Sequence, residues 1–159
     1  MNVTRRAVQD SDEALLRALY ATTRKFELNQ VPFTPEQKQA FLAMQFDAQR
    51  KHYSANYPQG VHEVICADNN PVGRVWTAVL EDELRIMDIT LLPEWRGRGV
   101  GAAVLRELIA QSEALSKPLR VWVEIWNPSQ GIFQHLGFQA GNNDGVNVLF
   151  ERKTEKATA

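Results

Sequence analysis

The spacing of apolar residues changes several times along this chain of 159 residues. In the first third, apolar side chains recur every three or four positions, as at Leu15, Leu16 and Leu19, which is typical of an amphipathic helix. Between residues 62 and 91 the period falls to two, which predicts strands joined by tight polar turns. Helical spacing returns over residues 99–116, and further strands follow.

Start and stop signals set the bounds of the expected elements. Thr34, Pro35 and Gln37 provide an N-cap, a proline at the first helical position and a capping-box glutamine. The expected elements, in chain order, are a strand over 3–8, a helix from Asp10, a break over 29–33, a helix from Thr34 that ends before Pro58, strands over 62–67, 72–80 and 84–91, a helix over 99–116, a strand over 119–125, a short helix over 129–136, and closing strands around Phe138 and over 146–152.

These elements predict an α+β fold. Links of a few polar residues favour antiparallel neighbours, whereas the helix over 99–116 is a crossover that makes one parallel pair. We therefore expect a mixed, mainly antiparallel central sheet flanked by helices, with one βαβ unit. Since the chain shows no repeat and no low-complexity linker, we expect one domain over residues 1–153 and a short polar tail over 154–159.

Composition narrows the range of partners. A net charge of −1 and a pI of about 6.3 argue against nucleic acid. No segment is apolar enough to span a membrane, and the first ten residues lack a signal-peptide core. Cys66 is the single cysteine, which excludes an intrachain disulfide and a cysteine metal cluster. We expect a cytoplasmic protein with no nucleic-acid or membrane partner, and the sequence leaves a homodimer open.

The most distinctive local feature is the loop Gly97-Arg98-Gly99-Val100-Gly101-Ala102. Its three glycines stand at every second position, directly before an amphipathic helix, and let the backbone approach a ligand closely. The free amides of the first helical turn and the helix dipole favour an anion there. Arg96 and Arg98 add positive charge. The loop therefore predicts a site for a phosphorylated cofactor.

Two cofactor classes compete for this loop. The loop satisfies the dinucleotide pattern G-x-G-x-x-A, and Glu124 follows Ala102 at about the distance of a ribose-binding acid. However, residues 93–96 separate the loop from its strand, and the chain offers one crossover rather than repeated βαβ units. A dinucleotide-binding protein therefore remains a remote alternative.

A different spacing, Arg96-x-x-Gly99-x-Gly101, resembles the coenzyme A loop of the GNAT superfamily of N-acetyltransferases. A second segment also resembles that family, with a strand, an asparagine, a short helix and a terminal Leu-Gly-Phe, as in residues 121–128 and 133–138. The resemblance implies an enzyme that transfers acetyl from acetyl-CoA, as co-substrate, to a primary amine of a small molecule or peptide. The amine would attack the thioester directly within a ternary complex.

The resemblance also implies cofactor contacts. The pantetheine arm would pair with the backbone of Ile89, Thr90 and Leu91, where a bulge and divergence from the next strand open a slot. The diphosphate would lie on the amides from Gly97 to Ala102, beside Arg96 and Arg98, and Asn127 would contact the cofactor. Phe133 stands where the family often has a tyrosine that protonates the departing thiolate, and we expect it to pack against the pantetheine. Because phenylalanine has no proton to give, a non-catalytic acyl-CoA-binding module is the competing class.

A general base is needed because an ammonium must lose its proton before its nitrogen can attack a thioester. The candidate bases are Glu124 and Asp88, with Glu63 third. The alternative interpretations are a solvated strand residue for Glu124 and a hydrogen-bonded structural acid for Asp88. The histidines His52, His62 and His135 are scattered, so we expect no metal site there. His135, Tyr53 and Tyr57 are remote candidates for the missing acid. We expect core positions for Trp76, Trp122 and Trp126.

Overall fold

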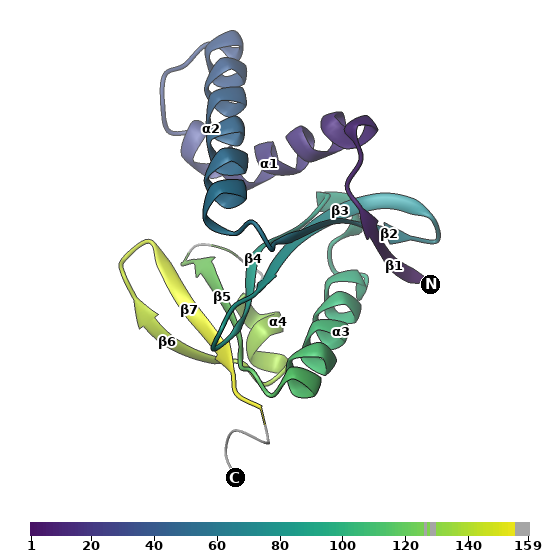
Figure 1. Cartoon of the computed structure of the whole chain (residues 1–159). Coiled ribbons are helices and arrows are strands. Elements are labelled where there is room, and N and C mark those ends of the chain that lie inside the picture. The colour runs from purple at the N-terminus through teal and green to yellow at the C-terminus, as the bar shows by residue number, and fades with distance from the viewer. Residues whose placement is uncertain (126, 128–129, 155–159) are drawn as a thin grey trace.

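The computed structural model describes residues 1–125, 127 and 130–154, and these residues form one mixed sheet with helices on both faces (Figure 1). Its strands are ordered β1-β2-β3-β4-β5-β7-β6. The elements are β1 (Val3–Ala7), the short helix η1 (Asp10–Asp12), α1 (Glu13–Leu28), α2 (Pro35–Asn56), β2 (Val61–Ala67), β3 (Asn70–Val79), β4 (Leu84–Leu91), η2 (Pro93–Trp95), α3 (Val100–Leu115), β5 (Leu119–Glu124), α4 (Gln130–His135), β6 (Gln139–Asn143) and β7 (Asn147–Arg152).

The expected fold class is confirmed. Strands β1 to β4 pair antiparallel, β4 and β5 pair parallel through the α3 crossover, and β5, β7 and β6 are again antiparallel. Element bounds differ from expectation by one or two residues at most ends. Residues 126, 128 and 129, which include the expected core residue Trp126, and residues 155–159 of the expected tail lie outside the described residues, while Thr154 is buried.

The start of α2 follows the expected local chemistry. The Thr34 side chain accepts a hydrogen bond from the Gln37 amide at 3.1 Å, and the Gln37 side chain accepts one from the Thr34 amide at 2.9 Å. The start of α1 differs: the regular helix begins at Glu13, after a single 3-10 turn. The reason is that the buried Asp12 carboxylate binds the guanidinium of Arg6, at 2.8 and 2.9 Å, rather than capping α1.

The main hydrophobic core lies between the sheet and helices α3 and α4. It combines strand residues such as Ile65, Ile86 and Val121 with Leu105 and Leu108 of α3. We call this side of the sheet the α3/α4 face. The opposite side, the α1/α2 face, carries a smaller cluster in which Leu16, Tyr20 and Phe46 pack together. Helix α2 projects away from the sheet (Figure 1), and Phe46 is its buried residue.

Candidate active site

Strands β4 and β5 start side by side and then diverge, as Figure 1 shows. Their pairing runs from Leu84 with Leu119 to Ile86 with Val121 and stops there. Beyond that point β4 continues to Leu91 and β5 to Glu124. The edge of β4 that faces the gap therefore lacks a neighbouring strand at Ile89, Thr90 and Leu91, as expected for a slot that accepts an extended ligand.

A β-bulge lies at the point of divergence. Trp76 pairs with Asp88 and Thr77 pairs with Ile86, so Met87 is an extra residue in β4. A bulge inserts one residue and reverses the side-chain alternation beyond it. Ile86 therefore faces the α3/α4 core, while Asp88 reaches Arg74 on the α1/α2 face. The bulge lies two residues before the segment where the resemblance implied it.

The glycine loop joins the end of β4 to the start of α3. Gly97 and Gly99 have φ angles of +73° and +87°, a region that favours glycine, and Gly99 is the N-cap of α3. Gly99 has no side chain to cap this helix, and among the described residues no side-chain acceptor binds the first-turn amides at Val100, Gly101 and Ala102, which point outward. A Cβ atom built at Gly97 or Gly99 meets no heavy atom within 4 Å, so the space over the loop is open. Open space and outward-pointing amides are the features by which a helix start binds an anion, and the diphosphate at this loop stays a prediction.

Two arginines flank the loop in different ways. Arg96 Nε donates to the carbonyl oxygen of Leu91 at 3.2 Å, and its Nη2 donates to Thr22 Oγ1 of α1 at 3.3 Å. The Arg98 guanidinium lies over the ring of Trp95, 4.9 Å from its centre. Both side chains belong to exposed residues, so their positive charge is available to an anion on the loop.

The two candidate bases lie on the α1/α2 face, one on each diverging strand. Burial alternates along β5, with Val121 and Val123 in the core and Trp122 and Glu124 turned away from it. The Glu124 side chain is 25% exposed, and its Oε1 lies 3.2 Å from Arg24 Nη1 of α1. Glu63 lies apart from both, because it pairs with Arg5, which also reaches Glu107 of α3.

Asp88 is held by an ion pair with a buried partner. Arg74 Nε donates to Asp88 Oδ2 at 2.5 Å, and Thr90 Oγ1 donates to Oδ1 at 3.1 Å. Arg74 is fully buried, stacks near Phe46 and also donates to Gln49 of α2. Both Asp88 oxygens are therefore engaged, which agrees with the structural interpretation of this acid.

The second family-like segment lies across the gap from β4. The backbone N–H of Asn127 donates to the Glu124 carbonyl oxygen at 2.9 Å, and Gln130 Nε2 donates to the Ile125 carbonyl oxygen at 2.6 Å, which ties α4 to the end of β5. Phe133 of α4 is 3% exposed and packs in the core against Phe138 and Phe150. Its contact with a pantetheine stays a prediction, whereas its ring fills part of the hydrophobic core in the structure.

An aromatic pocket lies on the α1/α2 face beside the bulge, and the sequence did not single it out as a pocket. It has a volume of about 120 Å³ and is lined by His52, Tyr53, Tyr57, Arg85, Ile86, Met87 and Trp122. Trp122 is 40% exposed, so its expected core position is wrong, whereas Trp76 is buried as expected. The feature of the sequence that could have indicated this pocket is the spacing of Tyr53 and Tyr57, which lie one helical turn apart.

Two titratable side chains near this pocket have strongly shifted pKa values. Burial raises the pKa of Tyr53 to about 12, and its hydroxyl donates to the carbonyl oxygen of Met87 at 3.3 Å. Burial, together with the positive charge of Arg74, lowers the pKa of His62 to about 4. The His62 ring stacks on Trp76, with centroids 4.0 Å apart.

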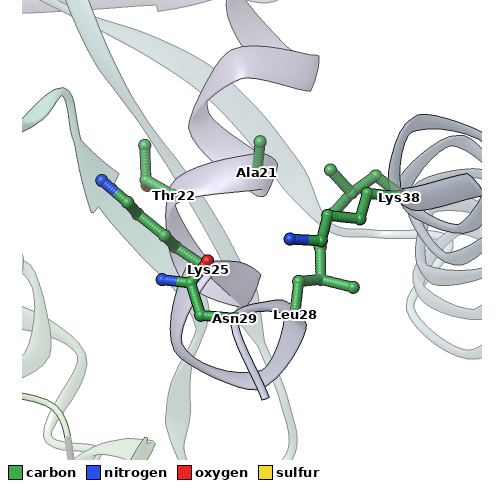
Figure 2. Close-up of a pocket in the computed structure, with 7 residues that line it drawn as sticks. Ala21, Thr22, Lys25, Leu28, Asn29 and Lys38 are labelled. Carbon is green, nitrogen blue, oxygen red and sulfur yellow. The ribbon is translucent and has the colours of Figure 1, made fainter. Parts of the chain in front are cut away.

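A larger hollow, of about 270 Å³, lies between α1 and α2. Figure 2 shows Lys38 reaching from α2 toward α1, while Thr22 and Lys25 lie on α1 and Asn29 directly follows it. Helix side chains line this hollow, and neither the candidate carboxylates nor the strand ends contribute to it, so we place the chemistry at the diverging strands instead.

Among the described residues no group of three or more His, Cys, Asp or Glu side chains could hold a metal ion. Within the same part of the chain, no helix has the length and apolar character needed to cross a membrane.

Comparisons with known proteins agree with this geometry. The acetyltransferase (GNAT) family model matches residues 17–138. A curated relative from Bacillus subtilis, named as a ribosomal protein bS18-alanine N-acetyltransferase, is 29% identical over 93 residues, which cover 57% of this chain and 61% of the relative. The match therefore spans less than two thirds of that relative's length.

Solved structures share the fold at low sequence identity. The PaiA N-acetyltransferase from Thermoplasma acidophilum, in complex with coenzyme A, has a TM-score of 0.72 at 16% identity, covering 96% of this chain and 99% of that one. An acetyltransferase from Thermus thermophilus has a TM-score of 0.67 at 19% identity, covering 96% and 97%. A Salmonella typhimurium acetyltransferase that modifies the N-terminal serine of a 50S ribosomal subunit protein has a TM-score of 0.66 at 16% identity, covering 98% and 96%. With the family model matching most of its length, this chain belongs to the GNAT family of acetyltransferases, which use acetyl-CoA as the acetyl donor.

Proposed function

We propose that this protein is an acetyl-CoA-dependent N-acetyltransferase that acetylates a primary amine by direct attack in a ternary complex. The observation that carries the proposal is the divergence of β4 and β5 after Ile86 and Val121, next to a helix start that no side chain in the described part of the chain caps. Acetyl-CoA supplies an activated acetyl thioester. The chain supplies an unpaired strand edge at Ile89, Thr90 and Leu91 for an extended arm and an anion site from Gly97 to Ala102 for the diphosphate.

Glu124 is the general base in this proposal. It lies on the face that an acceptor would approach, it is partly exposed, and its partner Arg24 is itself partly exposed, so the pair can open. Asp88, with both oxygens engaged by Arg74 and Thr90, acts as a structural acid that holds the strand end. The thiolate leaves without a tyrosine acid at Phe133, because alkyl thiols with a pKa of about 8.5 are tolerable leaving groups near neutral pH.

The acceptor is a primary amine of a small molecule or a peptide. The Bacillus subtilis and Salmonella typhimurium relatives are named for protein amines, which supports the peptide class. A cytoplasmic location is part of the proposal, and the single, buried and unpaired Cys66 agrees with a reducing compartment. The homodimer left open by the sequence stays a prediction, which light scattering tests.

The experiment is release of free thiol from acetyl-CoA on adding a panel of amines, including 2-phenylethylamine, ethylamine and a peptide with an N-terminal alanine. We expect stoichiometric thiol release and acetylated amine with at least one acceptor. Coenzyme A binding by calorimetry, without thiol release with any amine, would favour the non-catalytic binding module. Tight NADH binding without coenzyme A binding would instead revive the dinucleotide interpretation.

A further inference from the structure

We propose that the aromatic pocket beside the bulge binds the apolar ring of the acceptor, and that the preferred acceptor is an amine with an aromatic ring two carbons from its nitrogen. The inference rests on the proposed function, since it names the substrate class of the same site. It assigns Trp122 as a residue that determines specificity.

The position of the pocket supports this assignment. Ile86 and Val121 form the last pair between β4 and β5, and Met87 and Trp122 are the next residue on each strand. Both Met87 and Trp122 line the pocket. The pocket therefore lies at the apex of the diverging strands, on the α1/α2 face that carries both candidate carboxylates.

The chemistry of the lining favours a ring over an ammonium group. Tyr53, Tyr57 and Trp122 contribute aromatic surface, and none of the described residues that line the pocket is a carboxylate. The charge of Arg85 is balanced within a network of two arginines and two glutamates, because Arg85 pairs with Glu83 while Arg120 pairs with both Glu83 and Glu151. A volume of about 120 Å³ is comparable with the roughly 150 Å³ cavity that accepts benzene in an engineered protein.

The aromatic wall is held in place before any ligand arrives. The Tyr53 hydroxyl donates to the Met87 carbonyl oxygen, and the Tyr53 ring meets the edge of Trp76 with centroids 5.0 Å apart. Tyr57 packs edge-on against Tyr53 at 6.4 Å. A rigid wall binds a rigid ring with little loss of side-chain entropy.

The spacing along β5 places the amine near the proposed base. Trp122 and Glu124 lie on one face of the strand, two residues apart, which corresponds to about 6.6 Å. An arylethylamine spans a similar distance from ring to nitrogen. With its ring against Trp122, its nitrogen reaches the level of Glu124 and of the unpaired β4 edge.

The test compares kcat/KM for 2-phenylethylamine and ethylamine in the wild type, in Trp122→Ala and in the control Leu115→Ala. Leu115 is 39% exposed, close to the 40% of Trp122, but lies at the end of α3. We expect the wild type to favour 2-phenylethylamine at least tenfold. Trp122→Ala lowers kcat/KM for 2-phenylethylamine about tenfold, mainly through KM, which corresponds to the loss of about 1.4 kcal/mol from one aromatic contact. Ethylamine turnover, coenzyme A affinity and the Leu115→Ala variant stay within twofold of the wild type.

The inference is overturned if the wild type prefers ethylamine, or if Trp122→Ala lowers kcat/KM equally for both amines. It is also overturned if the wild type uses the alanine peptide faster than 2-phenylethylamine and Trp122→Ala leaves kcat/KM for the peptide unchanged. Calorimetry of 2-phenylethylamine with the coenzyme A-saturated protein separates this failure from failure of the proposed function. Saturable binding that Trp122→Ala weakens supports the pocket even if no amine is acetylated. Absence of saturable binding overturns the pocket, whether or not other amines are turned over.

Discussion

Asp88 and Glu124 are the same kind of group in different surroundings. Asp88 faces a guanidinium that is fully buried, and its side chain is 17% exposed. Glu124 faces Arg24, which remains partly in solvent. Removing one partner of a buried pair leaves an uncompensated charge, whereas an exposed pair contributes little to stability. The two carboxylates should therefore separate into a structural and a catalytic role.

Glu124→Gln and Asp88→Asn test this separation. Glu124→Gln lowers kcat by roughly 10²- to 10⁴-fold, the usual range for loss of a general base, and leaves coenzyme A affinity nearly unchanged. Asp88→Asn lowers the free energy of unfolding by about 3–5 kcal/mol, because Arg74 stays buried without its counter-ion. Steady-state kinetics, calorimetry and urea unfolding measure the three quantities. A full rate in Glu124→Gln with the true acceptor removes it as the base.

His62 makes stability depend on pH. Its ring is buried against Trp76, and its Nε2 has no hydrogen-bond partner among the described residues. Its pKa of about 4 in the folded protein lies below the ordinary value of 6.5, so the folded state keeps it neutral where the unfolded chain binds a proton. Protonation therefore favours unfolding, and the contribution of His62 is present above pH 6.5 and lost as the pH falls toward 4.

The expected loss of unfolding free energy between pH 6.5 and pH 4.5 is on the order of 2 kcal/mol. His62→Phe, which keeps the stack and cannot be protonated, flattens this slope and leaves stability at pH 7.5 equal or higher. His52→Phe, on the exposed face of α2, is the matched control and keeps the slope. Urea unfolding at several pH values measures how the free energy of unfolding depends on pH in each variant. Asp12 does not interfere, since Arg6 lowers its pKa below 3.8 and its effect appears in more acidic solution. A slope that His62→Phe leaves unchanged contradicts the assignment.

At the scale of elements, the glycine loop and the first turn of α3 act together. Gly97 and Gly99 need glycine for their backbone angles, whereas Gly101 lies in regular helix. A Cβ atom at Gly101 lies 3.7 Å from Leu91 Cδ1 and 3.9 Å from Ile132 Cδ1, which are ordinary contacts. Gly101 can therefore be changed without disturbing the fold, and Gly99 cannot.

Gly101→Ala is expected to weaken coenzyme A binding about tenfold, because the new methyl group, 3.7 Å from Leu91 Cδ1, narrows the space between the first turn of α3 and the strand edge proposed for the pantetheine arm. Its free energy of unfolding stays within about 1 kcal/mol of the wild type, the size of the helix-propensity difference between glycine and alanine. Gly99→Ala weakens both, and Gly141→Ala in β6, where a Cβ atom also meets only ordinary contacts, weakens neither. Calorimetry and urea unfolding provide the readouts. Unchanged affinity in both Gly101→Ala and Gly99→Ala would place the diphosphate elsewhere.

At the scale of the whole molecule, α1 connects both sides of the gap between the diverging strands. Thr22 of α1 binds Arg96, just after β4, and Arg24 of α1 binds Glu124, at the end of β5. These contacts join residues 74 and 100 positions apart in the sequence. The ends of β4 and β5 do not pair with each other, but α1 links them on the α1/α2 face.

Coenzyme A should stabilise the whole molecule, since its site is formed by separate elements that come together only in the folded state. At a concentration of 100 times Kd, a ligand of the native state adds about 2.7 kcal/mol. For a domain of this size this corresponds to a rise in Tm of roughly 5–10 °C. Thermal unfolding with coenzyme A, and with NADH at the same concentration as the control, measures it. A rise with NADH alone contradicts the cofactor assignment.

The order of elements, the α2 cap and the glycine loop follow from the sequence by itself. Each depends on residues within a few positions of one another: apolar periodicity, the reciprocal bonds of Thr34 and Gln37, and the φ angles that only glycine adopts easily at Gly97 and Gly99. The family-like spacing from Arg96 to Gly101 is equally local. Such features need no knowledge of distant partners.

The tertiary structure alone decided the surroundings of the candidate residues. The bulge at Met87 turns Asp88 away from the core face of Ile86 and toward Arg74, a change that simple alternation does not predict. Trp122 is exposed at the point where β4 and β5 stop pairing, and Glu124 meets a helix from the other end of the chain. Strand register and contacts between distant residues set these environments, because they arise only when the elements pack.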